Sequence, residues 1–152
     1  MEHQLSQHSS DGQHEAIPIV FQWLDEAFHG VHLADGFVVV PLHPDTPFMV
    51  TAVDSVDAGR LLDVRVPFLD RVPLTPALDQ YIAQNDVVAE GHLHVVPDLA
   101  DATVGRLEVR YRIAVNLMDQ QSLVQLGLRL SMSTSGIGPY IQQRFGGVVV
   151  KS

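Results

Sequence analysis

The segment from Gly105 to Leu117 has the most regular pattern in the chain and sets the strongest limit on its fold. Apolar residues alternate with polar or small ones, in the order Leu107, Glu108, Val109, Arg110, Tyr111, Arg112, Ile113, Ala114, Val115, Asn116, Leu117. Successive side chains of a β-strand point to opposite faces, so this pattern predicts a long strand with one buried and one solvated face. Strands of this kind are typical of antiparallel sheets that are covered on one side.

Four shorter runs supply neighbours for this strand. Residues 36–43, 48–54 and 60–68 are rich in β-branched side chains and are separated by the turn segments "PDTP" and "SVDAG". They predict an antiparallel meander. In the third run Asp63 and Arg65 alternate with apolar residues, which again predicts one solvated face. Residues 91–96 predict a further strand, joined to the long one by the loop "PDLADATVG".

Three segments have the spacing of amphipathic helices. Between Ala16 and His29 the apolar residues recur at intervals of three and four, namely Ile17, Val20, Phe21, Leu24 and Phe28. Thr75 and Pro76 suit the N-cap and first position of a second helix. Asp119 suits the N-cap of a third, which Gly146 and Gly147 end. Within it, Gly136, Gly138 and Pro139 predict a kink or two successive helices.

These elements predict a single α+β domain over residues 15–147, with an antiparallel sheet of about five strands packed with helices in the order α-β-β-β-α-β-β-α. Residues 1–14 are polar and rich in Ser, Gln and His, so we expect a flexible tail. Residues 148–152 are expected to form a second tail or an edge strand.

The composition argues against several classes of protein. Eighteen acidic and nine basic residues among 152 give a formal charge of −9, which disfavours nucleic-acid binding. The absence of cysteine excludes disulfides and thiol chemistry. No apolar run approaches the length of a membrane span, and the first residues lack the features of a signal peptide. We therefore expect a cytoplasmic protein that does not insert into membranes.

The order of the elements resembles the type III secretion chaperone-like fold and, within it, the YbjN-like family of bacterial proteins. "DGFVVV" followed by "PFMVTAVD" is similar to the first hairpin of that family, and "LDQYIAQNDVVAEGHLHV" to its helix–strand junction, with Asn85 at the expected place. "GRLEVRYRIAVNLMDQQSLVQLGLRL" resembles its last strand and last helix. The resemblance covers about residues 16–147.

This resemblance implies a binding protein rather than an enzyme. YbjN-like proteins are often described as sensory-transduction regulators, and the secretion chaperones are small, acidic homodimers that hold partner proteins partly extended. It implies no cofactor. The chain departs from the pattern in its histidine-rich first residues and in the Gly/Pro segment of the last helix.

His92 and His94 raise the possibility of a metal site. Two residues apart on a strand, they share one face, as in many zinc and iron sites. A third ligand would have to come from carboxylates such as Glu90 and Asp98, or from the histidines in "HGVHLAD" and at His43. Leu93 and Val95 provide the buried face of this strand, so both imidazoles are expected to point away from the core. A metal- or small-ligand-binding protein that uses this pair is the alternative function.

Arginines on the predicted strands are the main candidates for partner binding. Arg65, Arg110 and Arg112 fall on one sheet face, whereas Arg60 is in the opposite phase and fits less well. Cross-strand pairing with Asp63 and Glu108 would explain them without a partner. A docking face for an acidic or extended peptide is the functional interpretation.

The last helix offers a candidate dimer surface made of Leu123, Leu126, Leu128, Leu130 and Met132. The first, second and fourth of these could instead cover the sheet, which would leave Leu128 and Met132 for a second copy of the chain. No nucleophile elbow, dinucleotide fingerprint or P-loop is present, and no residue is expected to be catalytic.

Overall fold

The computed structural model describes residues 16–84, 88 and 90–150. The expected tail over residues 1–14 and the junction residue Asn85 lie outside these residues. The fold is α+β, as predicted. Within the described residues, its sheet is antiparallel and has seven strands, which are in chain order β1 (His32–Ala34), β2 (Phe37–Val40), β3 (Phe48–Ser55), β4 (Gly59–Pro73), β5 (His92–Pro97), β6 (Val104–Ala114) and β7 (Val148–Val149).

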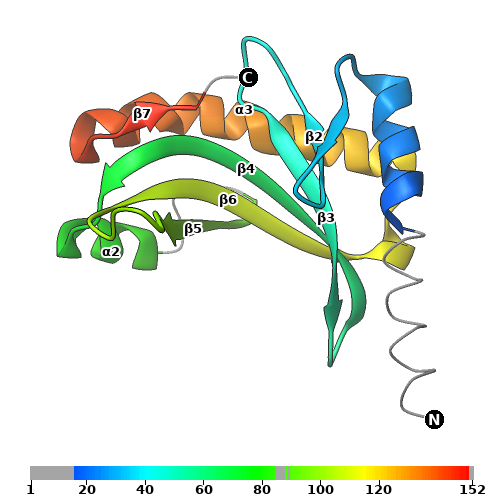
Figure 1. Cartoon of the computed structure of the whole chain (residues 1–152), viewed down its shortest axis with the longest axis horizontal. Helices are drawn as coiled ribbons and strands as arrows, with labels where there is room; N and C mark the ends of the chain where they lie inside the picture. The colour runs from blue at the N-terminus through cyan, green and yellow to red at the C-terminus, as the bar shows by residue number, and fades with distance from the viewer. Residues whose placement is uncertain (1–15, 85–87, 89, 151–152) are drawn as a thin grey trace.

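The strands are ordered β1-β2-β3-β4-β6-β5 across the sheet, and β7 pairs with β4. β4 is the longest strand and lies at the centre of this arrangement (Figure 1). β6 pairs with it from Leu61 to Pro73, and β3 pairs with its other side as far as Arg65. Beyond that point β7 takes the place of β3, pairing with Leu69 and Asp70. β4 therefore joins three different strands into one sheet.

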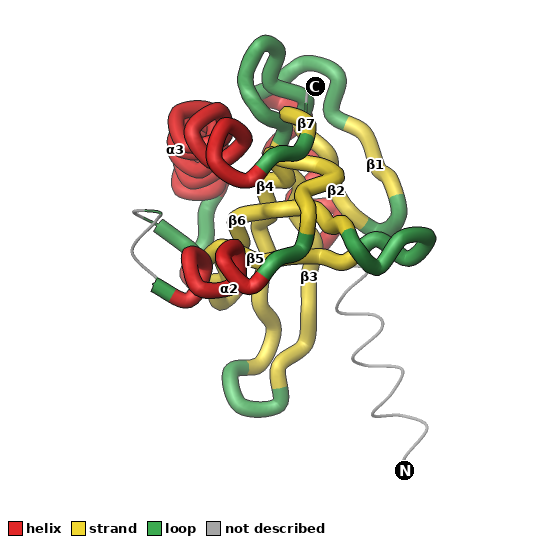
Figure 2. The backbone as a smooth tube through the Cα atoms, turned by 90° about the vertical axis from the view of Figure 1, so that its left-hand side faces the viewer, coloured by secondary structure: helices red, strands yellow, loops and turns green. Residues whose placement is uncertain are grey.

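Helices cover one face of this sheet. The first described helix spans residues 16–27, α2 spans Pro76–Ala83 and α3 spans Gln120–Phe145. α3 runs along the sheet, whereas α2 lies near the end of β5 (Figures 1 and 2). Gln120 at the start of α3 donates hydrogen bonds to the carbonyl of Trp23 and the carboxylate of Glu26, which fastens the first helix to α3.

The core lies between the sheet and these helices. Val64, Val66 and Phe68 of β4 face Leu123 and Leu130 of α3, and all five are buried. Gly127 of α3 allows the ring of Phe48 to approach the helix, because a Cβ at this position would lie 2.6 Å from ring atom Cε1. Phe48 also meets the edge of Phe28, with ring centroids 5.8 Å apart.

The predicted N-caps are confirmed. The Thr75 hydroxyl accepts a hydrogen bond from the amide of Leu78, and the Asp119 carboxylate accepts one from the amide of Ser122. Each satisfies an amide that has no partner inside its helix.

At Gly136, Gly138 and Pro139 the sequence predicted either a kink or two successive helices, and the second of these alternatives is wrong. α3 is one helix across all three positions. Pro139 removes one backbone hydrogen bond, but Gly138 and Ile141 on either side of it are buried, so packing against the core holds the helix together here.

The long strand ends earlier than predicted. β6 stops at Ala114, and Val115–Leu117 form a short 3-10 helix. Ala114 already pairs with Leu61, close to the beginning of β4, so residues further along have almost no partner strand. The sequence pattern did not predict β1. For residues 148–152 it predicted either a tail or an edge strand, and β7 is that edge strand.

Among the described residues, no helix is both long and apolar enough to cross a membrane.

Candidate functional site: the polar face of the sheet

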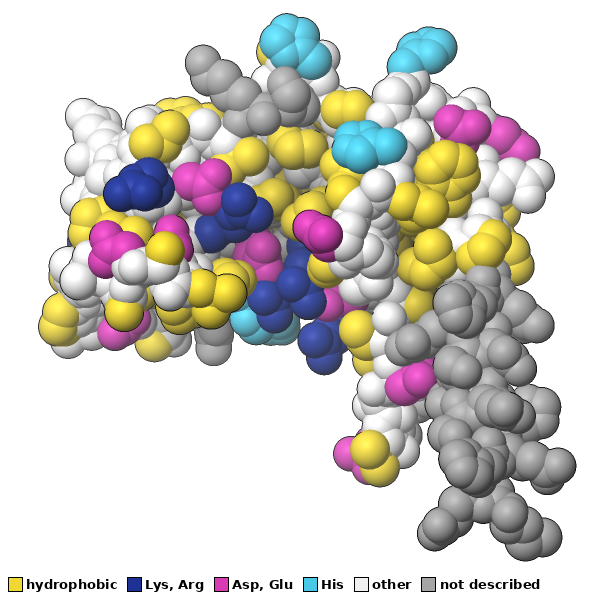
Figure 3. Space-filling view, viewed as in Figure 1, with side chains coloured by type: hydrophobic (Ala, Val, Ile, Leu, Met, Phe, Trp, Pro, Cys, Tyr) yellow, Lys and Arg dark blue, Asp and Glu magenta, His cyan; other side chains and the backbone are white. Residues whose placement is uncertain are grey.

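The face of the sheet opposite the helices carries the predicted arginines. Arg65 of β4 is directly opposite Arg110 of β6, and Asp63 is opposite Arg112. Glu108 is opposite His94 of β5 on its other side. The alternation of both strands therefore brings Arg65, Arg110 and Arg112 together, as predicted. Basic and acidic side chains gather over the middle of the molecule in Figure 3.

Two carboxylates lie beneath these arginines. Asp63 is 0% exposed and Glu108 is 3% exposed, so the expectation that Asp63 lies on a solvated face is wrong. Isolated charges are costly to bury, and these are tolerated because arginines cover them. Oδ1 of Asp63 is buried without a hydrogen-bond partner among the described residues, so its pairing depends on Oδ2.

Arg65 links both carboxylates. Its Nε and Nη2 atoms donate to Asp63 Oδ2 at 3.1 and 2.9 Å, and its Nη1 lies 3.7 Å from Glu108 Oε1. The guanidinium also lies 5.1 Å from the ring centroid of Phe37 on β2. Contacts with two carboxylates and an aromatic ring fix this side chain in place. Arg65 is therefore mainly a structural member of the face.

Arg110 and Arg112 are held less completely. Arg110 donates through Nε to Glu108 Oε1 at 2.5 Å. Nη2 of Arg112 lies 3.7 Å from Asp63 Oδ2, and this side chain is 52% exposed. The expected cross-strand pairing with Asp63 and Glu108 is thus present only as the 3.7 Å contacts Arg112–Asp63 and Arg65–Glu108. The closer contacts, Arg110–Glu108 and Arg65–Asp63, each lie within one strand.

Arg60 does not join this group. It is opposite Asp54 at the first pairs of β4, in the phase of the core residues, and its Nε lies 3.6 Å from Asp54 Oδ1. The predicted partner-binding set is therefore reduced to three arginines on one face.

His92 and His94 point away from the core, as predicted, and both are exposed. His92 is directly opposite Arg110. Partial burial and the neighbouring Arg110 guanidinium lower the pKa of His94, and the Glu108 carboxylate opposes this only in part. The neutral imidazole is therefore favoured at this position.

The carboxylates suggested as further metal ligands are engaged elsewhere. Glu90 accepts two hydrogen bonds from Arg129 of α3, which lower the pKa of its carboxyl group. Asp98 accepts a hydrogen bond from the amide of Ala100 within its own loop. In the part of the chain that the structure describes, no three His, Asp or Glu side chains are grouped as metal ligands would be. The metal alternative is thus left without a third ligand there.

A groove of about 800 Å³ extends from the arginines toward the free ends of β1 and β5. Its apolar side chains come from strands on either side of β4 and from neighbouring segments, and they are Ala34, Phe37, Val39, Met49, Val96, Pro97, Leu99 and Val148. Arg106 of the groove pairs with Asp70 at 2.7 Å. The charged side chains of the lining are Arg65, Arg71 and Arg106 together with Asp35, Asp70, Asp98 and Glu108. The sequence pattern did not reveal this groove, because its walls come from strands and loops that are far apart in the sequence.

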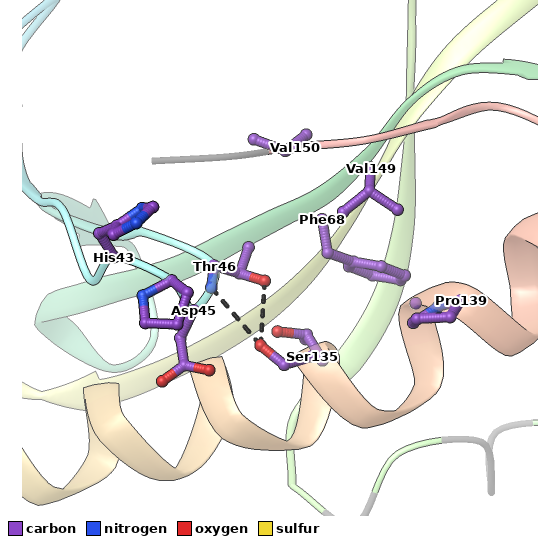
Figure 4. Close-up of a pocket in the computed structure, with 11 residues that line it drawn as sticks. His43, Asp45, Thr46, Phe68, Ser135, Pro139, Val149 and Val150 are labelled. Atoms are coloured by element: carbon purple, nitrogen blue, oxygen red, sulfur yellow. Dashed lines mark hydrogen bonds between the residues drawn. The ribbon is translucent and has the colours of Figure 1, made fainter.

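A second, smaller cavity of about 310 Å³ lies between α3 and the loop at residues 43–46 (Figure 4). Ser131 donates to the carbonyl of Thr46, and Ser135 Oγ lies 3.3 Å from Thr46 Oγ1. His43 points away from the Ser135 hydroxyl in Figure 4, so the two do not form a nucleophile–base pair. These hydroxyl groups fasten the loop to the helix.

The candidate dimer surface is smaller than predicted. Leu123, Leu126 and Leu130 are buried in the core of the monomer, so they cover the sheet rather than face a second chain. Leu128 is half-buried and Met132 is 64% exposed, and these two remain on the outer side of α3.

Comparison of the chain with protein-family models, with curated proteins and with solved structures finds no match. The geometry of the polar face and its groove is therefore the basis for assigning a function.

Proposed function

We propose that the protein is a non-enzymatic binding module that holds an extended segment of a partner protein in the groove on the polar face of its sheet. It would act as a chaperone, adaptor or regulator, as the YbjN-like resemblance implies, and we expect it to do so in the cytoplasm. The observation that carries this proposal is the groove itself, in which apolar side chains from β2, β3 and the β5–β6 connection lie next to ion-paired arginines.

The chemistry of the groove suits such a segment. An extended peptide presents side chains alternately to two sides, so apolar groups can contact Met49 and Val39 while polar groups meet Arg65 and Arg106. Leu99 at the rim is exposed, and a partner would remove it from water. Ion pairs with Asp63, Glu108 and Asp70 orient the arginines before any partner arrives, which lowers the entropy cost of binding.

The test is affinity capture from extracts of the producing cells, with chemical cross-linking and quantitative mass spectrometry. Leu99→Glu changes the groove rim, and Val56→Glu is a matched control because Val56 is equally exposed at the β3–β4 turn. We expect Leu99→Glu to deplete a partner that Val56→Glu retains. Equal recovery with both variants, or cross-links that map away from the groove, would refute the proposal.

We also propose that the protein forms a homodimer through the outer side of α3. Met132 and Tyr140 are exposed there, eight residues apart, with Leu128 one turn before Met132. Positions four residues apart lie on one side of a helix, so the three side chains form one apolar stripe. An isologous contact would bury it on both copies.

A further inference from the structure

A second pocket on the polar face lies beside the groove and has a different character. It measures about 530 Å³ and is lined by Gly91, His92, His94, Arg110, Tyr111 and Arg112. None of these lining residues is acidic, although the chain as a whole carries a formal charge of −9. The pocket is therefore rich in hydrogen-bond donors, and Glu108 and Asp63 beside it balance part of the charge of its arginines.

The register of the strands explains how these donors come together. His92 is directly opposite Arg110, which places their Cβ atoms about 5 Å apart. Because the two strands are antiparallel, His94 and Arg112 flank this pair on opposite sides, each two residues away on the same face, and His94 is opposite Glu108. Two imidazoles and two guanidinium groups thus project from the same side of β5 and β6.

The buried carboxylates orient the guanidinium groups. Glu108 binds Arg110 through Nε, and Asp63 is near only one terminal nitrogen of Arg112. The remaining terminal N–H groups are available to a ligand without breaking either contact. Since Asp63 is compensated chiefly by Arg65, and Glu108 by Arg110, the charge of Arg112 is left largely uncompensated.

We propose that this pocket binds a phosphoryl group. One arginine fork satisfies the two oxygens of a carboxylate, whereas the central His92–Arg110 pair, with Arg112 and His94 flanking it, offers more donors than a carboxylate can accept. A phosphoryl group presents three oxygens and a charge between −1.5 and −2, which suits this set. The group can belong to a phosphorylated segment of a protein or to a free phosphate compound.

Isothermal titration with inorganic phosphate, followed by NMR observation of the imidazole Cε1 protons, tests the pocket. We expect binding that perturbs the signals of His92 and His94. Arg112→Gln should weaken it about tenfold, equivalent to about 1.4 kcal/mol, since it removes charge-assisted hydrogen bonds to the ligand. Arg60→Gln is the control, because Arg60 likewise pairs with one carboxylate, that of Asp54, but lines neither the pocket nor the groove. Thermal unfolding checks that both variants fold.

Absence of phosphate binding, or equal weakening by both substitutions, would overturn the proposal. So would malonate binding as tightly as phosphate, because malonate has a similar charge without the tetrahedral geometry. His92→Gln provides a second variant on an exposed side chain, and it should also weaken binding.

The two sources of phosphate are separated with a short Val/Thr-rich peptide that carries one phosphoserine. Tighter binding of this peptide than of free phosphate assigns the pocket to a phosphorylated partner, and equal binding assigns it to a small phosphate compound. Leu99→Glu distinguishes this pocket from the groove: phosphate binding that survives in this variant while partner capture is lost shows that the two sites are separate.

Discussion

At the scale of single residues, the burial of Asp63 beneath arginines is the feature on which the polar face depends. A buried carboxylate without its partner costs far more than the pair contributes when intact. Arg65 holds Asp63 with two short hydrogen bonds, whereas Arg112 lies 3.7 Å away and is half exposed. Arg65 therefore compensates the buried charge of Asp63, whereas Arg112 contributes little to this compensation.

Substituting the two arginines separately should reveal this difference. We expect Arg65→Met to lower the free energy of unfolding by about 3 kcal/mol, because it leaves Asp63 buried and poorly compensated. Arg112→Gln should cost less than about 1 kcal/mol, as for an exposed pair. Urea denaturation of both variants measures this. Similar losses in the two would contradict the role assigned to Arg65.

Substitution by alanine should have opposite effects on stability at two glycines of α3, Gly127 and Gly136. A methyl group at Gly127 would collide with the Phe48 ring, and we expect Gly127→Ala to destabilise the fold by about 1–3 kcal/mol. Gly136 has no atom within 4 Å of an added Cβ, so Gly136→Ala should stabilise the helix by about 0.5–1 kcal/mol. Melting temperatures should therefore move in opposite directions, and a gain from Gly127→Ala would show that Phe48 relaxes freely.

At the scale of elements, the start of α3 should respond to acid. The hydrogen bond from the Ser122 amide lowers the pKa of Asp119, whose ordinary value is 3.8. The folded state therefore binds this proton less readily than the unfolded state, and the cap stabilises the protein above that pH and is lost as the pH falls.

Asp119→Asn tests this cap, since asparagine caps a helix without titrating. We expect the wild type to lose stability more steeply than the variant between about pH 5 and pH 3. Guanidinium denaturation across this range measures both slopes. Parallel slopes would mean that Asp119 does not control the acid response of α3.

Elements with a regular pattern or a local signal could be predicted from the sequence, and those fixed by distant partners could not. The alternation in β6 and the caps at Thr75 and Asp119 have purely local causes. The end of β6 at Ala114 depends on where β4 begins, and β7 exists because β4 extends beyond β3. The continuity of α3 through Pro139 likewise depends on packing that no local rule contains.

The same division applies to the candidate site. Alternation placed Arg65, Arg110 and Arg112 on one face and turned His92 and His94 outward. It could not show that Asp63 is buried, because polarity alone does not reveal that arginines from neighbouring strands cover it. The groove could not be predicted from alternation either, because its walls come from segments as distant in sequence as Phe37 and Leu99.

At the scale of the whole molecule, the outer side of α3 is the surface proposed for dimerisation. Met132→Glu should convert a dimer to a monomer, because it would bury two like charges against each other across a two-fold contact. Light scattering across a concentration series measures the mass, with Val56→Glu as the control at a distant exposed site. A wild type that remains monomeric throughout would contradict the proposal.

The position of β4, bonded to β3 and β7 on one side and to β6 on the other, has a consequence for the dynamics of the protein. Amide hydrogens bonded on a central strand exchange with solvent only when the sheet opens, whereas the outer strands β1 and β5 can separate alone. Deuterium uptake should therefore be slowest in β4. The groove and the phosphoryl pocket both draw residues from the fast-exchanging margins, so bound ligands should be detectable as local protection there while the centre remains unchanged.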